Sequence, residues 1–184
     1  MKNKVDKLDA MFDIETLGIS ERAPVVEIGV ILFERKTGKI QDEDLFKINL
    51  LSYKNYNGSF EMDYSTVLFW LNQTKIAQDK VFKDNSNGNN VFTAFNAVNE
   101  MLAYAGTLWC HPSFDYKILE YHLKIMGLEN NVPFYKARDL RTVIDLSGYD
   151  YKNHPFDGTK HSALDDCKFQ LSYLMACLKI LKGK

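Results

Sequence analysis

The stretch Ala10-Met11-Phe12-Asp13-Ile14-Glu15-Thr16-Leu17 organises the rest of this chain. It has the pattern of a β-strand that ends in carboxylates. Residues i and i+2 of a strand point to the same face, so Asp13 and Glu15 project together while Phe12 and Ile14 face a core. Two neighbouring anions repel each other unless a cation neutralises them, and carboxylates suit Mg²⁺ or Mn²⁺. The stretch alone predicts either a metal site or a solvated acidic strand end.

Length and composition predict one globular domain over residues 1–184, with residues 1–7 disordered. The chain is 46% hydrophobic and 26% charged, an ordinary balance for a protein with a packed core. Its formal net charge of −1 does not indicate a strongly basic binder of long nucleic-acid duplexes. That charge is compatible with an enzyme that grips only a few phosphates.

The cysteines and the first residues predict a cytoplasmic protein. Cys110, Cys167 and Cys177 form an odd set without metal-type spacing, which is typical of reduced thiols. The lysines of residues 1–7 are followed by no apolar segment of the kind found in secretion signals. No apolar run reaches the length of a membrane span, so we expect no membrane partner.

The pattern along the chain predicts a sheet followed by helices. Strands are expected at about Leu8 to Glu15, Val25 to Glu34 and Lys39 to Leu50, and short connections suggest an antiparallel meander. Another strand is expected at residues 107–111, and residues 84–90 are predicted to be a mobile loop. Helices are expected from about Tyr64 and at residues 91–104, 114–126, 138–146 and 163–181.

Further carboxylates follow the later elements. Asp115 comes just after the predicted strand at residues 107–111, where it could be a metal ligand or an acid that stabilises a helix N-terminus. His161 is followed by Asp165 and Asp166 at the start of the last predicted helix. Ser162 and Asp165 fit a capping box, which leaves Asp166 free to face the site. On a continuous helix, Asp165 would instead share the face of His161, and spacing alone does not choose.

These motifs together resemble those of the DEDD superfamily of 3′–5′ exonucleases. The matching segments are Phe12-Asp13-Ile14-Glu15-Thr16, Ser113-Phe114-Asp115 and His161-Ser162-Ala163-Leu164-Asp165-Asp166. His161 and Asp166 match the H-x-x-x-x-D pattern of the DEDDh branch, which favours Asp166 over Asp165 as the ligand. The segment Thr66-Val67-Leu68-Phe69-Trp70-Leu71-Asn72-Gln73 also resembles a helix of the exodeoxyribonuclease A-like and RNase AS-like members. One departure is Cys110-His111-Pro112, where RNase AS-like members tend to have a Gly/Asn-rich segment.

The resemblance implies an α/β, RNase H-like fold, with a mixed five-stranded sheet whose first three strands are antiparallel and are flanked by helices. It implies a metal-dependent 3′–5′ exonuclease that releases nucleoside 5′-monophosphates from single-stranded or short DNA or RNA. Asp13, Glu15, Asp115 and Asp166 would hold two Mg²⁺ or Mn²⁺ ions, and His161 would be the general base. The implied substrate contacts are Thr16, Leu17, Phe114 and Ser113; Ser113 fits a helix cap better than a ligand, and Phe114 fits core packing equally well. Relatives are commonly dimeric, so a homodimer is also an expectation.

Two other functions fit parts of this pattern. The chain could be a catalytically silent nucleic-acid-binding or interaction module on the same fold, in which case Mn²⁺ and a nucleotide would stabilise it without cleavage. A carboxylate-pair glycoside hydrolase would act without metal. The exonuclease is favoured because all five motif positions are filled. Preference for DNA or RNA depends on how the pocket treats the 2′-hydroxyl, which no motif reports.

Overall fold

A computed structural model describes residues 8–83 and 87–183 of the chain. Its five strands are β1 (Leu8–Thr16), β2 (Val25–Phe33), β3 (Ile40–Lys47), β4 (Ala105–Cys110) and β5 (Ala137–Asp139), and they form one sheet in the order β3-β2-β1-β4-β5. The first three strands pair antiparallel, while β4 is parallel to β1 and β5 is parallel to β4. The predicted meander and mixed five-stranded sheet are therefore present. Residues 1–7 and 84–86, where disorder and mobility were predicted, lie outside the described residues.

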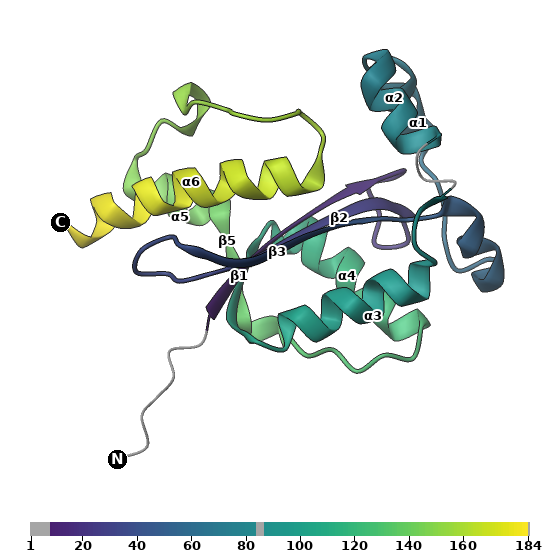
Figure 1. Cartoon of the computed structure of the whole chain (residues 1–184), viewed down its shortest axis with the longest axis horizontal. Coiled ribbons are helices and arrows are strands. Elements are labelled where there is room, and N and C mark those ends of the chain that lie inside the picture. Colours follow the sequence, from purple (N-terminus) through teal and green to yellow (C-terminus); the bar gives the residue numbers. More distant parts are fainter. Residues whose placement is uncertain (1–7, 84–86, 184) are drawn as a thin grey trace.

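Helices cover the two faces of the sheet (Figure 1). On one face lie α3 (Val91–Leu102) and α4 (Lys117–Ile125), and on the other lie α5 (Leu140–Ser147) and α6 (Ala163–Lys182). Alternation along β1 divides its side chains between two cores. Phe12 and Ile14 pack on the α3 side, whereas Met11 packs on the side of α5 and α6. Asp13 and Glu15 follow Met11 at intervals of two residues, so their side chains lie on the same face of the strand and face α6.

Strand β2 lies between β1 and β3, and all nine of its residues are buried. Its apolar, β-branched sequence suits a strand that is covered on both faces. Gly29 lets α6 approach closely, since a Cβ at this position would lie 2.4 Å from the backbone carbon and oxygen of Ala163. The start of α6 is thereby seated directly on β2.

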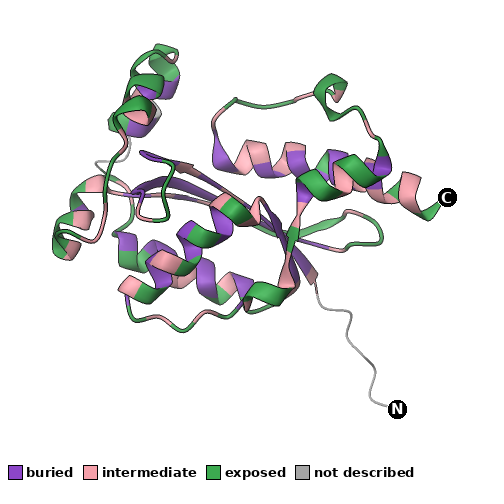
Figure 2. Cartoon of the chain, turned by 180° about the vertical axis from the view of Figure 1, so that it is seen from behind, coloured by how far each residue is buried: buried purple, intermediate pink, exposed green. Residues whose placement is uncertain are grey.

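Two short helices, α1 (Tyr64–Leu71) and α2 (Lys75–Phe82), stand apart from these layers beyond one end of the sheet (Figure 1). Much of their surface is exposed (Figure 2). Their buried residues form a small separate core in which Trp70 packs with Leu17 and Val26. Asp63 caps α1 by accepting a hydrogen bond from the Thr66 backbone N–H.

Several predicted boundaries were wrong. The helix expected at residues 114–126 begins as a π-helical turn, η3 (Pro112–Tyr116), and Ser113 lies inside this turn rather than at a cap. The helix expected at 138–146 begins at Leu140, because residues 137–139 pair with β4 as strand β5. Helix α2 and the 3₁₀ turns η1 (Leu50–Tyr56), η4 (Phe134–Lys136) and η5 (Tyr151–Asn153) were not predicted.

In the described part of the chain, none of the helices has the length and apolar character required to cross a bilayer.

Candidate active site

Strand β1 presents Asp13 and Glu15 towards the first turns of α6, which supplies Asp166. One carboxylate oxygen from each of these three residues lies within 4.8 Å of the others. Gln170, one turn further along α6, donates a hydrogen bond of 2.6 Å from Nε2 to Asp13 Oδ1. Residues more than 150 positions apart in the chain thus form a single cluster of oxygen atoms.

Asp115 reaches the same region from η3, the turn that follows β4. It is 2% exposed, and its Oδ2 accepts a hydrogen bond of 2.6 Å from the His111 backbone N–H. Its charge acts on Asp13, although its oxygens lie outside the group of three. Isolated π-helical turns are frequent at functional sites because they redirect a side chain. We call Asp13, Glu15, Asp115 and Asp166 the acidic cluster.

Burial and mutual repulsion make this cluster costly to ionise without a cation. Burial raises the pKa of Asp13 well above its ordinary value, and the charges of Asp115, Glu15 and Asp166 raise it further. Burial likewise raises the pKa of Asp115 to about 7. Burial followed by the charge of Asp165 raises the pKa of Asp166 to about 6. In the described part of the chain, no lysine or arginine forms an ion pair with the cluster.

Glu15 and Asp166 share a side-chain hydrogen bond, which requires a proton on one of the two carboxyl groups. Burial raises the pKa of Glu15 well above its ordinary value, and the charges of Asp166 and Glu27 raise it further. A divalent cation would replace the proton and relieve the repulsion among all four carboxylates. The donor set consists of hard oxygen atoms, and these residues therefore fit Mg²⁺ or Mn²⁺.

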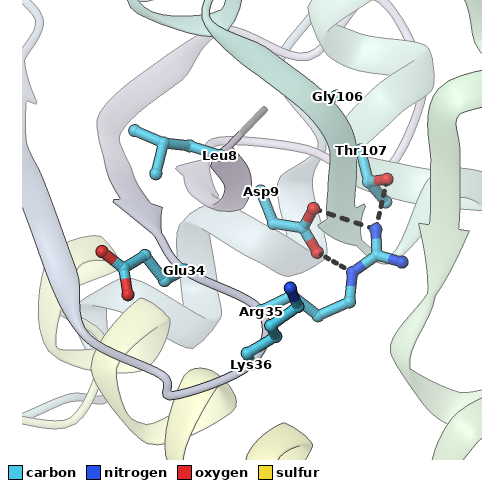
Figure 3. A pocket seen from close by; sticks show the side chains of 7 residues that line it. All are labelled: Leu8, Asp9, Glu34, Arg35, Lys36, Gly106 and Thr107. Carbon is cyan, nitrogen blue, oxygen red and sulfur yellow. Dashed lines mark hydrogen bonds and ion pairs between the residues drawn. The ribbon is translucent and has the colours of Figure 1, made fainter. Parts of the chain in front are cut away.

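Asp9, at the other end of β1, shows the contrasting case of a neutralised carboxylate (Figure 3). Arg35 donates two hydrogen bonds to its oxygens, of 2.5 and 2.9 Å, and a third of 2.5 Å to Thr107 Oγ1. Trp109 Nε1 adds a bond of 2.7 Å to Asp9. A cavity of about 560 Å³ adjoins this group. Because Arg35 already neutralises Asp9, this group ties strands together and lacks the uncompensated charge of the acidic cluster.

His161 lies at the edge of the acidic cluster, on the loop that leads into α6. Its Nδ1 is 3.9 Å from Glu15 Oε1, and its side chain is 36% exposed. The ring lies edge-on to Phe69 and Trp70, with centroid distances of 5.3 and 5.8 Å. Burial, followed by the charge of Lys160, lowers the pKa of His161. The imidazole is therefore neutral at pH 7 and able to accept a proton.

A pocket of about 270 Å³ opens beside Glu15. Thr16 and Phe114, two of the predicted substrate contacts, line it together with residues of α1. Thr16 is fixed by a hydrogen bond of 2.6 Å from its Oγ1 to Gly18 O. The Trp70 indole N–H donates a bond of 2.8 Å to Thr16 O, so this buried residue is part of both the core and the pocket wall.

Two of the predicted substrate contacts lie elsewhere. Leu17 is 3% exposed and packs in the core beneath α1, so its side chain does not reach the pocket. Ile19, two residues further on, is 72% exposed and lines the pocket instead. Ser113 is absent from this pocket and lines a neighbouring hollow of about 420 Å³, which shares Phe114 and Ile19 with it.

The predicted capping box at the start of α6 does not form. Ser162 makes no side-chain cap hydrogen bond, and Asp165 accepts a bond of 2.9 Å from the Thr159 backbone N–H. Glu27 of β2 accepts a bond of 3.3 Å from the Ala163 backbone N–H, another of the donors that this helix start leaves without an intrahelical partner. Sequence reasoning missed Glu27 and Gln170. Glu27 had a visible signal, since it is the one charged residue in an otherwise apolar strand.

The chain is similar in sequence to one family of known proteins. The sequence profile described as the 3′-5′ exoribonuclease Rv2179c-like domain matches residues 8–178. No curated protein sequence gives a significant match.

Solved structures share the fold at low sequence identity. The nuclease domain of 3′hExo, described as a DEDDh family member bound to rAMP, is 17% identical with a TM-score of 0.57, over 98% of this chain and 94% of that one. Cell-death related nuclease 4 is 14% identical with a TM-score of 0.65, and the match covers 95% of this chain and 64% of that one. E. coli ExoI, in a complex with ssDNA, is 10% identical with a TM-score of 0.63, and the match covers 96% of this chain and 40% of that one. These similarities confirm the predicted fold.

Proposed function

The chain belongs to the family of Rv2179c-like 3′-5′ exoribonuclease domains, and from this membership we propose that its substrate is RNA. It is a metal-dependent 3′–5′ exonuclease of the DEDDh group, as its motifs predicted. The choice of RNA over DNA rests on the family. The structure adds a pocket beside Glu15 whose lining includes Thr16, Ser65 and Thr66. Their hydroxyl groups donate to Gly18 O and Asp63, and each oxygen keeps the capacity to accept a hydrogen bond from a ribose hydroxyl.

In the proposed mechanism, Asp13, Glu15, Asp115 and Asp166 would hold two Mg²⁺ or Mn²⁺ ions. Bound ions of this kind lower the pKa of water and stabilise the charge that develops on a phosphate undergoing attack. The observation that supports the site is the convergence of Asp13, Glu15 and Asp166, whose oxygens lie within 4.8 Å of one another. Among the described residues, no lysine or arginine forms an ion pair with them. Gln170 orients Asp13 through its hydrogen bond of 2.6 Å.

His161 acts as the general base in this proposal. The neutral imidazole accepts a proton from the attacking water, and Nδ1 is the ring nitrogen that faces the cluster in this conformation. The water oxygen bonds to phosphorus while the bond from phosphorus to the 3′-oxygen breaks, and the leaving 3′-oxygen takes up a proton from solvent water. The products are a nucleoside 5′-monophosphate and a chain shortened by one nucleotide with a free 3′-hydroxyl. The exposed position of the ring beside Phe69 leaves room for it to approach a bound substrate.

The terminal nucleotide is proposed to occupy the pocket next to Glu15. Thr16 would meet the sugar, and Phe114 would offer an apolar surface to a base, a contact that tolerates any sequence. Ile19 takes the role expected of Leu17, because Ile19 is the exposed side chain of the pair.

Oligomeric state and location complete the proposal. A homodimer is supported by exposed apolar residues on α1 and α2, among them Tyr64, Leu71 and Ile76. Light scattering on the purified protein would test it. A cytoplasmic location is supported by three buried cysteines that form no disulfide.

The test uses matched RNA and DNA oligomers of one sequence, labelled in parallel at the 5′ end or at the 3′ end, with Mg²⁺, Mn²⁺ or EDTA. We expect a ladder of RNA products shortened from the 3′ end, together with mononucleotides, and no cleavage in EDTA. Asp13→Asn should abolish cleavage, while His161→Ala should lower the rate at least about a hundredfold with little change in metal affinity. Equal cleavage of both oligomers would refute the RNA preference, and full activity in both variants would refute the site.

A further inference from the structure

His161 has an unusual backbone conformation. Within residues 8–83 and 87–183, it is the one non-glycine residue with a positive φ, of 60°. The left-handed region is unfavourable for a residue with a Cβ, because this atom approaches the following carbonyl group. A residue stays in this region only where surrounding contacts hold it there, and such residues cluster at functional sites. The contacts on either side of His161 therefore indicate what fixes its place.

Asp165 supplies one of these contacts from the first turn of α6. Its Oδ2 accepts a hydrogen bond of 2.9 Å from the Thr159 backbone N–H. Gly158, with a φ of 140°, lies directly against it, since a Cβ there would be 3.0 Å from Asp165 Cβ and Cγ. The Ser162 backbone N–H in turn donates a bond of 3.2 Å to Thr159 O. Asp165 thus closes the turn formed by residues 158–162, with His161 inside it.

Other contacts fix the far side of this turn. Asp166 accepts a hydrogen bond from the His161 backbone N–H, and Glu27 accepts one from Ala163. The imidazole itself makes ring contacts with Phe69 and Trp70. The backbone of His161 is therefore held on its C-terminal side by the cluster and β2. On its N-terminal side, Asp165 ties Thr159 of the loop to α6, while earlier in the loop His154 is hydrogen-bonded to Ser172 and Phe156 packs against Phe169.

We propose that Asp165 is a positioning residue, whose carboxylate holds the turn in the conformation that presents His161 to the acidic cluster. The proposal rests on the assignment of His161 as general base. Asp165 acts through an oxygen that accepts a hydrogen bond from Thr159, and it contributes no ligand to the group formed by Asp13, Glu15 and Asp166. Its effect on catalysis therefore depends on the presence of the imidazole.

The test compares Asp165→Ala with Asp165→Asn, each alone and combined with His161→Ala. An Asn side chain keeps an oxygen that can accept the Thr159 N–H but carries no charge. Asp157→Asn is the matched control, because Asp157 is an exposed acid in the same loop. Steady-state cleavage of a short RNA gives kcat and KM, calorimetry gives the Mn²⁺ affinity, and thermal melting reports folding.

We expect Asp165→Ala to lower kcat about tenfold, a part of the hundredfold or more that a general base contributes. KM and Mn²⁺ affinity should change less than about twofold, and Asp165→Asn should stay within about twofold of the parent in kcat. In the His161→Ala background, Asp165→Ala should have no further effect on kcat, since residues that act as one unit are not additive. Asp157→Asn should match the parent.

Three results would overturn the proposal. An equal loss in Asp165→Ala and Asp165→Asn would show that charge, rather than the hydrogen bond, matters. A full additional loss in the His161→Ala background would show that Asp165 acts independently of the imidazole. Full activity of His161→Ala alone would remove the group through which Asp165 acts. An inactive parent protein is a different result, because it would refute the proposed function itself.

Discussion

Replacing Asp115 by Asn should stabilise the protein in the absence of metal while it abolishes catalysis. Burial raises the pKa of Asp115 from 3.8 to about 7. The native protein therefore holds a proton on Asp115 at pH values where the unfolded chain has lost it. Between these two pKa values the native state binds more protons, so the free energy of unfolding falls as the pH rises. An Asn cannot ionise and avoids this loss, and its side-chain oxygen can still accept the His111 N–H.

The pKa shift sets the size of the effect. About three pKa units at about 1.4 kcal/mol each give up to about 4 kcal/mol in favour of Asp115→Asn above pH 8. The difference should shrink towards zero near pH 4, where Asp115 is protonated in both states. For a domain of this size, 4 kcal/mol corresponds to a rise in Tm of about 8–16 °C. Loss of repulsion with Asp13 acts in the same direction.

Thermal melts followed by circular dichroism in EDTA, at intervals from pH 4 to pH 8.5, would measure this effect. Asp145→Asn is a suitable control, because Asp145 is an exposed acid on α5 away from the cluster. Addition of Mn²⁺ at pH 8 should raise the Tm of the parent more than that of Asp115→Asn. A variant that is less stable than the parent in EDTA at pH 8 would refute the view that this carboxylate is destabilising without a cation.

Three other outcomes follow from the structure. Burial lowers the pKa of His122 to about 3, so protonation favours the unfolded chain. The free energy of unfolding should therefore fall as the pH drops from about 6.5 to 3, and acid titrations of His122→Gln should show a smaller fall in this free energy. Gly29→Ala should cost about 3 kcal/mol or more in urea unfolding, because its Cβ would overlap the backbone of Ala163, whereas Gly127→Ala, with open space around it, should cost only about 1–2 kcal/mol for its left-handed φ. Ile19→Ala should raise KM with little change in Tm, whereas Leu17→Ala should cost about 2–5 kcal/mol of stability. Equal losses of Tm in the two variants would contradict the placement of Ile19 at the pocket and of Leu17 in the core.

The first half of the sheet and the pairing of Asp13 with Glu15 could be predicted because their signals are local, whereas Asp115 and Asp166 were joined to them only by the resemblance to the exonuclease motifs. Strand alternation fixed the faces of Asp13 and Glu15, and the long apolar run marked β2 as buried. Helix α2 gave no comparable signal, since Ala77 and Val81 are its buried hydrophobic residues and the rest of its surface is polar or exposed. Strand β5 has three residues, too few to show a period, and its identity depends on pairing with β4.

The start of α6 shows why a correct local motif can fail. Ser162 and Asp165 have the spacing of a capping box, yet Asp165 turns back to Thr159 and the Ala163 N–H is satisfied by Glu27, 136 residues earlier. A capping box needs both side chains to face the helix N-terminus. Here Asp165 faces Thr159 and Ser162 makes no side-chain cap bond, and the helix start is held instead by a contact with β2 that is distant in sequence.

The contacts of this helix start with β2 explain how a strand without metal ligands governs the geometry of the site. Helix α6 carries Asp166 and Gln170, and its entry loop carries His161, so any shift of the helix start moves all three relative to β1. That start is fixed on β2 by Glu27, by the close approach at Gly29, and by a hydrogen bond of 3.3 Å from Cys167 Sγ to Gly29 O. The separation between the carboxylates of β1 and those of α6 is therefore set by packing on β2, and the spacing of the catalytic motifs in the sequence does not determine it.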